Sequence, residues 1–454
     1  RRIFLSGVVL FAASSAAIGL APSQEWLVAG RAIQGIGGAF MMPGTLSIIS
    51  NTFPPHERGR AIGTWAGVSA LALAIGPAVG GALTEYVSWR AIFFLNLPVA
   101  AGAVVVTLFA ARESYDRTVG RTVDIPGIAA LTIGLSTLVL ALVEGNNWGW
   151  GSPQVIALFA TAVVGLVAFY LVERHGKAPM VQFEFFRSRS FLGANAVAFI
   201  VSFAMLAMFF FLALYMQNIL GYSALEAGIR FLPSTVVIIF VAPLAGRLVD
   251  RIGARPLITA GLSIVAVSLF LQSQLTASSG YTQLLVPFML MGLGMGMTMS
   301  PMSTAGMNAV SPDKAGVASG ILSMSRMVGG TFGVAAIGAL FQHLSTGRLD
   351  ERLASVKLNG AQRDRILQDL GSGHARDAVT SLDPQTAERV ATAMKDAFVH
   401  ALSGSLKLSA GVAAAGAVLA FFLIDPNVQR QPDEAPGAEI TAEAAERSAD
   451  PVAV

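Results

Sequence analysis

Long apolar stretches dominate the chain and restrict it to one class of fold. The stretch from Ala61 to Leu83 holds no charged residue, and a helix needs roughly 20 apolar residues to cross a bilayer. Runs of this length are too long for buried strands, and lipid tolerates no open strand, so we expect an all-α polytopic membrane protein. Twelve spans are predicted, near 4–22, 26–50, 60–84, 91–111, 126–143, 155–172, 190–218, 225–246, 256–275, 283–309, 315–342 and 400–424.

The composition supports this class and excludes several functions. Hydrophobic residues make up 54% of the chain and charged residues 13%, whereas a soluble chain carries about 25% charged residues. The net charge of +3, without a clustered basic face, gives no reason to expect nucleic acid as a partner. There is no cysteine, the five histidines lack metal-ligand spacing, and no phosphate-binding loop occurs. We therefore expect no cofactor, no metal and no ATP-driven step. Polar residues at membrane depth are too sparse for an embedded enzyme, and no ring of like polar groups indicates a channel.

Basic residues in the connections predict the orientation. Alternate connections carry arginine or lysine, beginning with Arg1 and Arg2, whereas the short connections between them carry only Arg90. Basic loops stay in the cytoplasm. The first residues and the tail after Asp425 are therefore both expected on the cytoplasmic side.

The chain is predicted to consist of two related halves. The pattern Pro-x3-Gly-x3-Gly occurs at 55–63 and again at 312–320, and parallel halves of six helices are a known plan of transporters. If the halves match, two spans are expected before Arg1. The predicted parts are the remainder of an N-terminal bundle with four spans (1–111), a linker hairpin of two spans with its flanking loops (112–180), a C-terminal bundle of six spans (181–425) with a long external loop (343–399), and a disordered cytoplasmic tail (426–454). Within the external loop, Asp383 as N-cap and Pro384 at the first helical position predict an amphipathic helix that leads into the last span.

The glycines of the 61–83 stretch are spaced for close helix packing. Gly76 and Gly80 are four residues apart and share one helix face. Small residues let a second helix approach backbone to backbone, and Pro77 removes one backbone donor and favours a kink. Gly67 and Gly81 belong to the same set. The pattern suits either ordinary packing or a helix that moves against its neighbour.

Two motifs resemble those of a known family. Gly67, eight residues, Gly76-Pro77, two residues and Gly80-Gly81 resemble the antiporter motif of the major facilitator superfamily. The run WRAIFFLNLP at 89–98 resembles a signature of its fourteen-span drug:proton antiporter branch, whose members have six, two and six spans.

The resemblance implies a monomeric, multi-pass exporter in the bacterial cytoplasmic membrane. It would export hydrophobic or cationic small molecules in exchange for protons by alternating access, with its site at the midplane between the halves. A dedicated exporter of one endogenous metabolite, such as an antibiotic, a lipid precursor or a siderophore, is the alternative, and these residues do not separate the two.

Charged residues inside predicted spans are the candidates for proton coupling, because such charges are costly unless they contact protein or water. Arg31, with Gln34 close by, and Arg326 stand out. Arg31 lies where the family has an arginine linked to proton transfer, and Arg326 resembles an arginine of the same branch. Each could instead be a snorkelling or structurally paired arginine. No aspartate or glutamate lies deep in a predicted span, and the family's acidic residue belongs to its first helix.

Two further sets complete the candidates. One predicted loop resembles the cytoplasmic motif of the superfamily; it contains Gly246, Asp250, Arg251 and Gly253. The loop could lock against neighbouring helix ends and release when the halves move, or its basic residues could only fix the orientation in the membrane. Methionine, aromatic and amide side chains could line an adaptable substrate pocket, or could pack or contact lipid. These pocket candidates are Asn96, Met205, Met208, Phe209, Tyr215 and Gln217, of which Tyr215 and Gln217 match the branch pattern.

Overall fold

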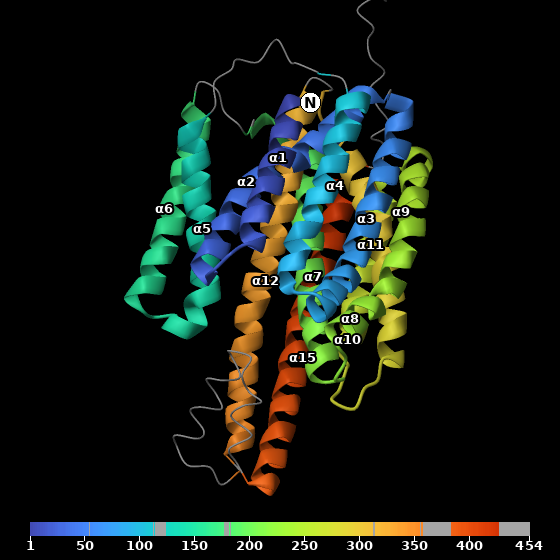
Figure 1. Ribbon diagram of the computed structural model, residues 1–454. Coiled ribbons are helices and arrows are strands. Elements are labelled where there is room, and N and C mark those ends of the chain that lie inside the picture. Colours follow the sequence, from blue (N-terminus) through green and yellow to red (C-terminus); the bar gives the residue numbers. More distant parts are fainter. Residues whose placement is uncertain are drawn as a thin grey trace, which may run out of the picture.

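Helices make up every regular element that the computed structural model describes (Figure 1). The described residues are 1–53, 55–111, 113, 124–176, 181, 183–311, 314–354, 356 and 383–425, and some side chains within 42–78 and at position 315 are left undescribed. The predicted tail 426–454 and most of the connection 112–123 lie outside the described residues. The expected all-α membrane fold is confirmed.

Four helices form the N-terminal part: α1 (Arg2–Gly19), α2 (Gln24–Thr52), α3 (Pro55–Tyr86) and α4 (Trp89–Ala110). Serine caps begin two of them, because the side chain of Ser23 accepts a hydrogen bond from Trp26 N and that of Ser88 accepts one from Arg90 N. α1 packs against both α2 and α4. This three-helix contact positions the polar residues described below.

The next two helices, α5 (Ile125–Trp148) and α6 (Pro153–His175), form a hairpin at one side of the molecule (Figure 1). They cross closely at Gly134 and Gly165, where a Cβ on Gly165 would lie 2.8 Å from the backbone of Gly134. The hairpin contacts α12 through Asn146, whose Nδ2 donates to Ala339 O at 3.0 Å.

The remaining helices form the C-terminal bundle. It comprises the short 3-10 helix η1 (Phe183–Arg187) and helices α7 (Arg189–Asn218), α8 (Ala224–Arg230), α9 (Leu232–Ile252), α10 (Ala254–Gln272), α11 (Thr282–Asn308), α12 (Ala315–Leu353) and α15 (Pro384–Leu423). Its core contains large, fully buried side chains such as Tyr215, Phe288 and Met208. The predicted span 225–246 is interrupted at Phe231, which separates α8 from α9 just before Pro233.

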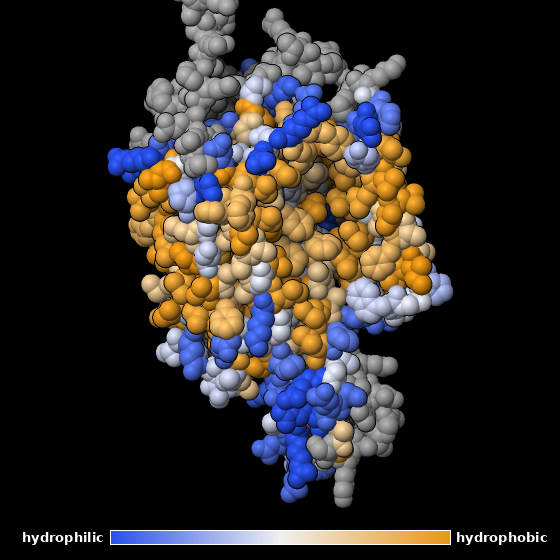
Figure 2. All heavy atoms as spheres, turned by 180° about the vertical axis from the view of Figure 1, so that it is seen from behind, coloured by the Kyte–Doolittle hydropathy of each residue, from blue (hydrophilic) through white to orange (hydrophobic). Residues whose placement is uncertain are grey.

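Within the described residues, ten helical segments are long and apolar enough to cross a membrane, with α8 and α9 counted together as one. The two other predicted spans, 26–50 and 60–84, correspond to α2 and α3, with 29 and 32 residues. The surface agrees, because a broad hydrophobic band separates hydrophilic residues at the two ends of the molecule (Figure 2).

Two helices are longer than their predicted spans. α12 has 39 residues and α15 has 40, so at 1.5 Å per residue each is about 60 Å long, twice the hydrocarbon thickness of about 30 Å. The additional turns cover 343–353 and 384–399, both within the predicted external loop. The turns from Pro384 with Asp383 as N-cap confirm the amphipathic helix predicted there, whereas the extension of α12 was not predicted. The two extensions pack together through Leu349, Leu353 and Val390. The first and last parts of the segment 343–399 are therefore helical and continue α12 and α15. Most of the residues between them lie outside the described residues.

Candidate functional site

A hydrogen-bonded polar network joins α1, α2 and α4. Arg31 Nη1 donates to Gln34 Oε1 at 2.6 Å, and Gln34 Nε2 donates to Ser15 Oγ at 2.5 Å. Asn96 Nδ2 donates to the same Ser15 oxygen at 3.2 Å. Two predicted site residues, Gln34 and Asn96, therefore meet at one oxygen, and Arg31 is joined to that oxygen through Gln34.

The local sequence explains the arrangement. Arg31 and Gln34 are three residues apart on α2, so their side chains lie on neighbouring positions of one face. Gln34 is 2% exposed and Ser15 is fully buried, whereas Asn96 is half-buried and Arg31 is exposed. The network thus runs from an exposed guanidinium to a buried hydroxyl.

Ser15 is the member that sequence reasoning missed. Its hydroxyl lies 19 residues from Gln34 and 81 residues from Asn96 in the chain. A serine in an apolar helix carries no charge and no spacing signal. The only sequence hint was its place in the pair Ser14-Ser15 within an otherwise apolar run.

Arg326 lies apart from this network, on α12. Its neighbour Ser325 donates to Asn195 Oδ1 on α7 at 2.9 Å, and Gly329 and Gly333 pack against the backbone of α7. Arg326 is half-buried. The structure describes no hydrogen bond or ion pair that joins it to Arg31, and its proton-coupling role stays a prediction.

The glycines of α3 divide into two groups. A Cβ on Gly81 would lie 2.9 Å from backbone atoms of Ala224 and Leu225 on α8, and one on Gly67 would lie 3.6 Å from Pro243 on α9. Gly80 instead faces α4, with 4.0 Å to Ile92 Cδ1, and Gly76 has open space. The close approach between the two halves therefore belongs to Gly81 and Gly67, not to the pair Gly76 and Gly80. The side chain of Pro77 lies outside the described set.

The predicted cytoplasmic loop joins α9 to α10. Gly253 has φ +79°, a conformation that favours glycine, and Gly246 is buried. The side chains of Asp250 and Arg251 are exposed, and none of the side-chain hydrogen bonds and ion pairs described for the structure involves them. The turn is therefore present, and the predicted lock stays a prediction.

The pocket candidates of α7 lie within the C-terminal bundle. Tyr215 is fully buried, and its hydroxyl donates to Thr276 O at 2.8 Å and to Ser279 O at 3.2 Å in the connection between α10 and α11. Met205 and Met208 are also buried. The ring of Phe209 lies 4.9 Å from that of Phe231, and Gln217 Nε2 donates to a carbonyl of its own helix. In this conformation these side chains pack against protein, apart from the network around Ser15.

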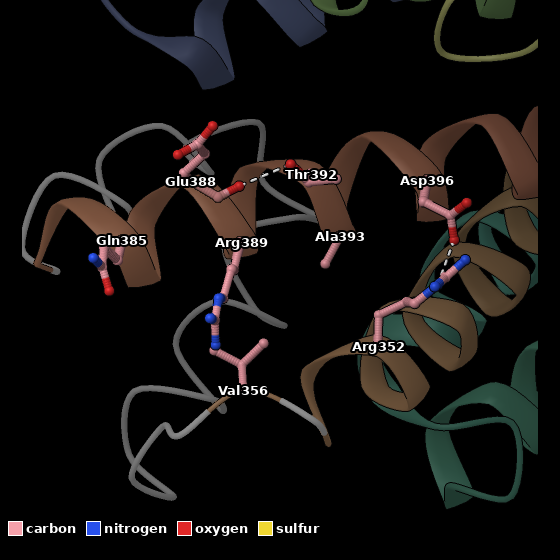
Figure 3. Close-up of a pocket in the computed structure, with 8 residues that line it drawn as sticks. All are labelled: Arg352, Val356, Gln385, Glu388, Arg389, Thr392, Ala393 and Asp396. Atoms are coloured by element: carbon pink, nitrogen blue, oxygen red, sulfur yellow. Dashed lines mark hydrogen bonds and ion pairs between the residues drawn. The ribbon is translucent and has the colours of Figure 1, made fainter.

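A pocket of about 750 Å³ lies at the other end of the molecule, between the extended ends of α12 and α15 (Figure 3). It is lined by Arg352, Val356, Gln385, Glu388, Arg389, Thr392, Ala393 and Asp396. Asp396 Oδ2 accepts hydrogen bonds from Arg352 at 2.8 Å and from Arg348 at 3.0 Å. In the described part of the chain, no three His, Asp or Glu side chains form a group that could hold a metal ion.

The long apolar helices and the polar network between them define a polytopic helical membrane protein. Residues 1–334 match the model of the Major Facilitator Superfamily. The chain therefore belongs to this superfamily and is a membrane transporter for small molecules, not an enzyme.

Similar bacterial proteins cover most of the chain. It is 31% identical over 440 residues to the tetracenomycin C resistance and export protein of Streptomyces glaucescens, covering 96% of this chain and 82% of the relative. It is 35% identical over 364 residues to the multidrug resistance protein Stp of Mycobacterium tuberculosis, covering 80% and 67%. It is 30% identical over 442 residues to the multidrug transporter MdtP of Bacillus subtilis, covering 93% and 81%.

Among solved structures, an auto-inhibited peptide transporter of the POT family matches the fold. The TM-score is 0.50 at 13% identity, covering 91% of this chain and 82% of that one. At this identity the likeness concerns the fold alone.

Proposed function

We propose that the protein exports hydrophobic or cationic compounds from a bacterial cell in exchange for protons, as a member of the fourteen-span drug:proton antiporter branch. The observation that carries the proposal is the sequence similarity over most of the chain to proteins named for multidrug resistance and antibiotic export. The protein would lie in the cytoplasmic membrane as a monomer, with its C-terminal tail in the cytoplasm.

Alternating access would use the contact between α3 and the pair α8 and α9. Gly81, which has no side chain, lies directly against the backbone of α8 at Ala224 and Leu225. Such a smooth contact lets two helical bundles roll against each other, as transporters built from repeats do. Substrate would bind between the halves and leave when the opposite side opens.

Proton coupling would use Arg31. Its fixed positive charge would favour the ionised form of a carboxyl group placed beside it, so a substrate that changes their separation would change proton binding. The side-chain oxygen of Gln34 accepts a hydrogen bond from one nitrogen of the Arg31 guanidinium.

Dye export tests the proposal. Cells that make the full-length protein are loaded with ethidium, and its efflux is followed by fluorescence with and without a protonophore. We expect efflux that stops when the proton gradient collapses. Efflux that is insensitive to the protonophore would exclude proton exchange, and an absence of ethidium efflux would exclude broad export of lipophilic cations.

A second candidate is a dedicated exporter of one metabolite. It is favoured because several relatives are named after single antibiotics, among them the puromycin resistance protein of Streptomyces alboniger, at 34% identity over 448 residues. Growth inhibition by a panel of unrelated antibiotics separates the two functions. Protection against many compounds supports the multidrug exporter, and protection against one compound supports the dedicated exporter.

A further inference from the structure

We infer that Ser15 is the positioning residue for Arg31, because its hydroxyl oxygen fixes the amide of Gln34 that holds the guanidinium. This inference rests on the proposed role of Arg31 in proton-coupled export. It adds a residue of α1 to a site otherwise expected on α2.

The chemistry of the side chains dictates the direction of each hydrogen bond. A guanidinium has only donors, so Gln34 must turn its carbonyl oxygen toward Arg31. Its amide nitrogen then needs an acceptor, and the buried acceptor within reach is Ser15 Oγ at 2.5 Å. Without that acceptor, the amide of Gln34 is free to rotate, and its oxygen no longer has a fixed place beside Arg31.

The oxygen of Ser15 is also shared. A hydroxyl oxygen has two lone pairs, and Ser15 accepts from both Gln34 and Asn96. The same atom thereby links α2, which carries the arginine, to α4, which carries a candidate substrate-binding amide. A displacement of Asn96 would reach Arg31 through three hydrogen bonds, those of Asn96 with Ser15, of Ser15 with Gln34 and of Gln34 with Arg31.

Ser14 provides the contrast that makes Ser15 specific. It is also buried, at 5% exposure, but its hydroxyl donates to Leu10 O and Phe11 O of its own helix. Two adjacent buried serines therefore differ in one respect. The hydroxyl of Ser14 donates a hydrogen bond within α1, and that of Ser15 accepts hydrogen bonds from side-chain amides on two other helices.

The experiment compares Ser15→Ala with Ser14→Ala in full-length protein reconstituted in vesicles. An imposed pH gradient drives uphill ethidium accumulation, and exchange of labelled for unlabelled ethidium at equal pH measures substrate movement without proton coupling. We expect Ser15→Ala to lower uphill transport about tenfold, the scale of one lost buried hydrogen bond, and to lower exchange by a clearly smaller factor, because exchange does not need Arg31 and feels only the loss of the bond to Asn96. Ser14→Ala should match wild type in both assays.

Three additional variants distinguish the possible failures. Ser15→Thr keeps the hydroxyl and should restore most uphill transport. The double variant Ser15→Ala with Arg31→Ala should be no worse than Arg31→Ala alone, because both changes remove the same function. If Arg31→Ala has no effect, the proposed role of Arg31 fails. If Arg31→Ala abolishes uphill transport but Ser15→Ala behaves like Ser14→Ala, the positioning role of Ser15 is wrong.

A substrate-independent measurement decides the case in which wild type does not move ethidium. The melting temperatures of Ser15→Ala, Gln34→Ala and the double variant then form a cycle. Non-additive losses support the hydrogen bond that positions Arg31, and additive losses overturn it.

Discussion

Gly81→Ala tests whether α3 and α8 must touch backbone to backbone. The added methyl carbon would lie 2.9 Å from the carbonyl carbon and the oxygen of Ala224 and from the Cα of Leu225. These are backbone atoms at the start of a helix capped by Ser223 and Glu226, so no side-chain rotation relieves the contact. Ordinary contacts between carbon atoms are about 3.5–4.0 Å, so the two helices must separate by about 0.5–1 Å.

The energetic consequence follows from overpacking. Extra methyl groups in a well-packed site cost about 1–3 kcal/mol, which corresponds to about a 5- to 150-fold change in an equilibrium between two conformations. If transport requires this contact in one state, Gly81→Ala should reduce the ethidium export rate by a factor in that range. The assay is initial export rate at matched amounts of protein in the membrane.

Gly76→Ala is the matched control. It makes the same chemical change in the same helix, but a Cβ there meets no atom of the described side chains or backbone within 4 Å. The gain in helix propensity of alanine over glycine, about 1 kcal/mol, is common to both variants. We expect Gly76→Ala to export like wild type. Equal export rates for the two variants would refute the reasoning.

Three other substitutions have expected outcomes. Tyr215→Phe should lower the unfolding free energy by about 1 kcal/mol, because it removes the hydroxyl that bonds to the α10–α11 connection, and it should leave the range of exported substrates unchanged. A change in which antibiotics the protein protects against would place Tyr215 in the substrate pocket instead. Asp396→Asn removes the charged partner shared by Arg348 and Arg352, so it should loosen the extended ends of α12 and α15 and speed proteolysis of 343–399, with an export rate like that of wild type. Unchanged proteolysis would mean that apolar packing alone holds the two ends together. Asn146→Ala should speed hydrogen exchange in the hairpin, because it removes a bond to α12; unaltered exchange would contradict this anchoring.

The membrane fold could be predicted from the sequence, because a bilayer directly requires apolar runs of a certain length. The start of α15 could also be predicted, from the capping residue Asp383 and from Pro384. The extension of α12 could not, because its polar end carries neither an apolar run nor a capping signal. The two extensions pack through contacts between residues far apart in the chain, such as Leu349 with Val390. The interruption at Phe231 was missed although Pro233 follows it closely, because a proline within a predicted span can kink a helix without ending it.

The candidate site was partly accessible for a similar reason. Arg31 and Gln34 stood out because polar groups inside an apolar span are costly, and the structure brings Asn96 to the same network. Glycine spacing predicted a smooth face on α3 but not which glycines meet the other half. That assignment to Gly81 and Gly67 depends on how α3 is rotated against α8 and α9, which spacing within one helix does not determine.

The central claim is that the two halves tilt against each other about the contact of α3 with α8 and α9. The chain has no cysteine, so spin labels can be placed specifically on exposed positions, at Glu85→Cys with Ser278→Cys on one side of the membrane and at Leu108→Cys with Ile252→Cys on the other. We predict that ethidium or a change in pH lengthens one distance and shortens the other. Distances that stay fixed on both sides, in a protein that still exports ethidium, would contradict the account.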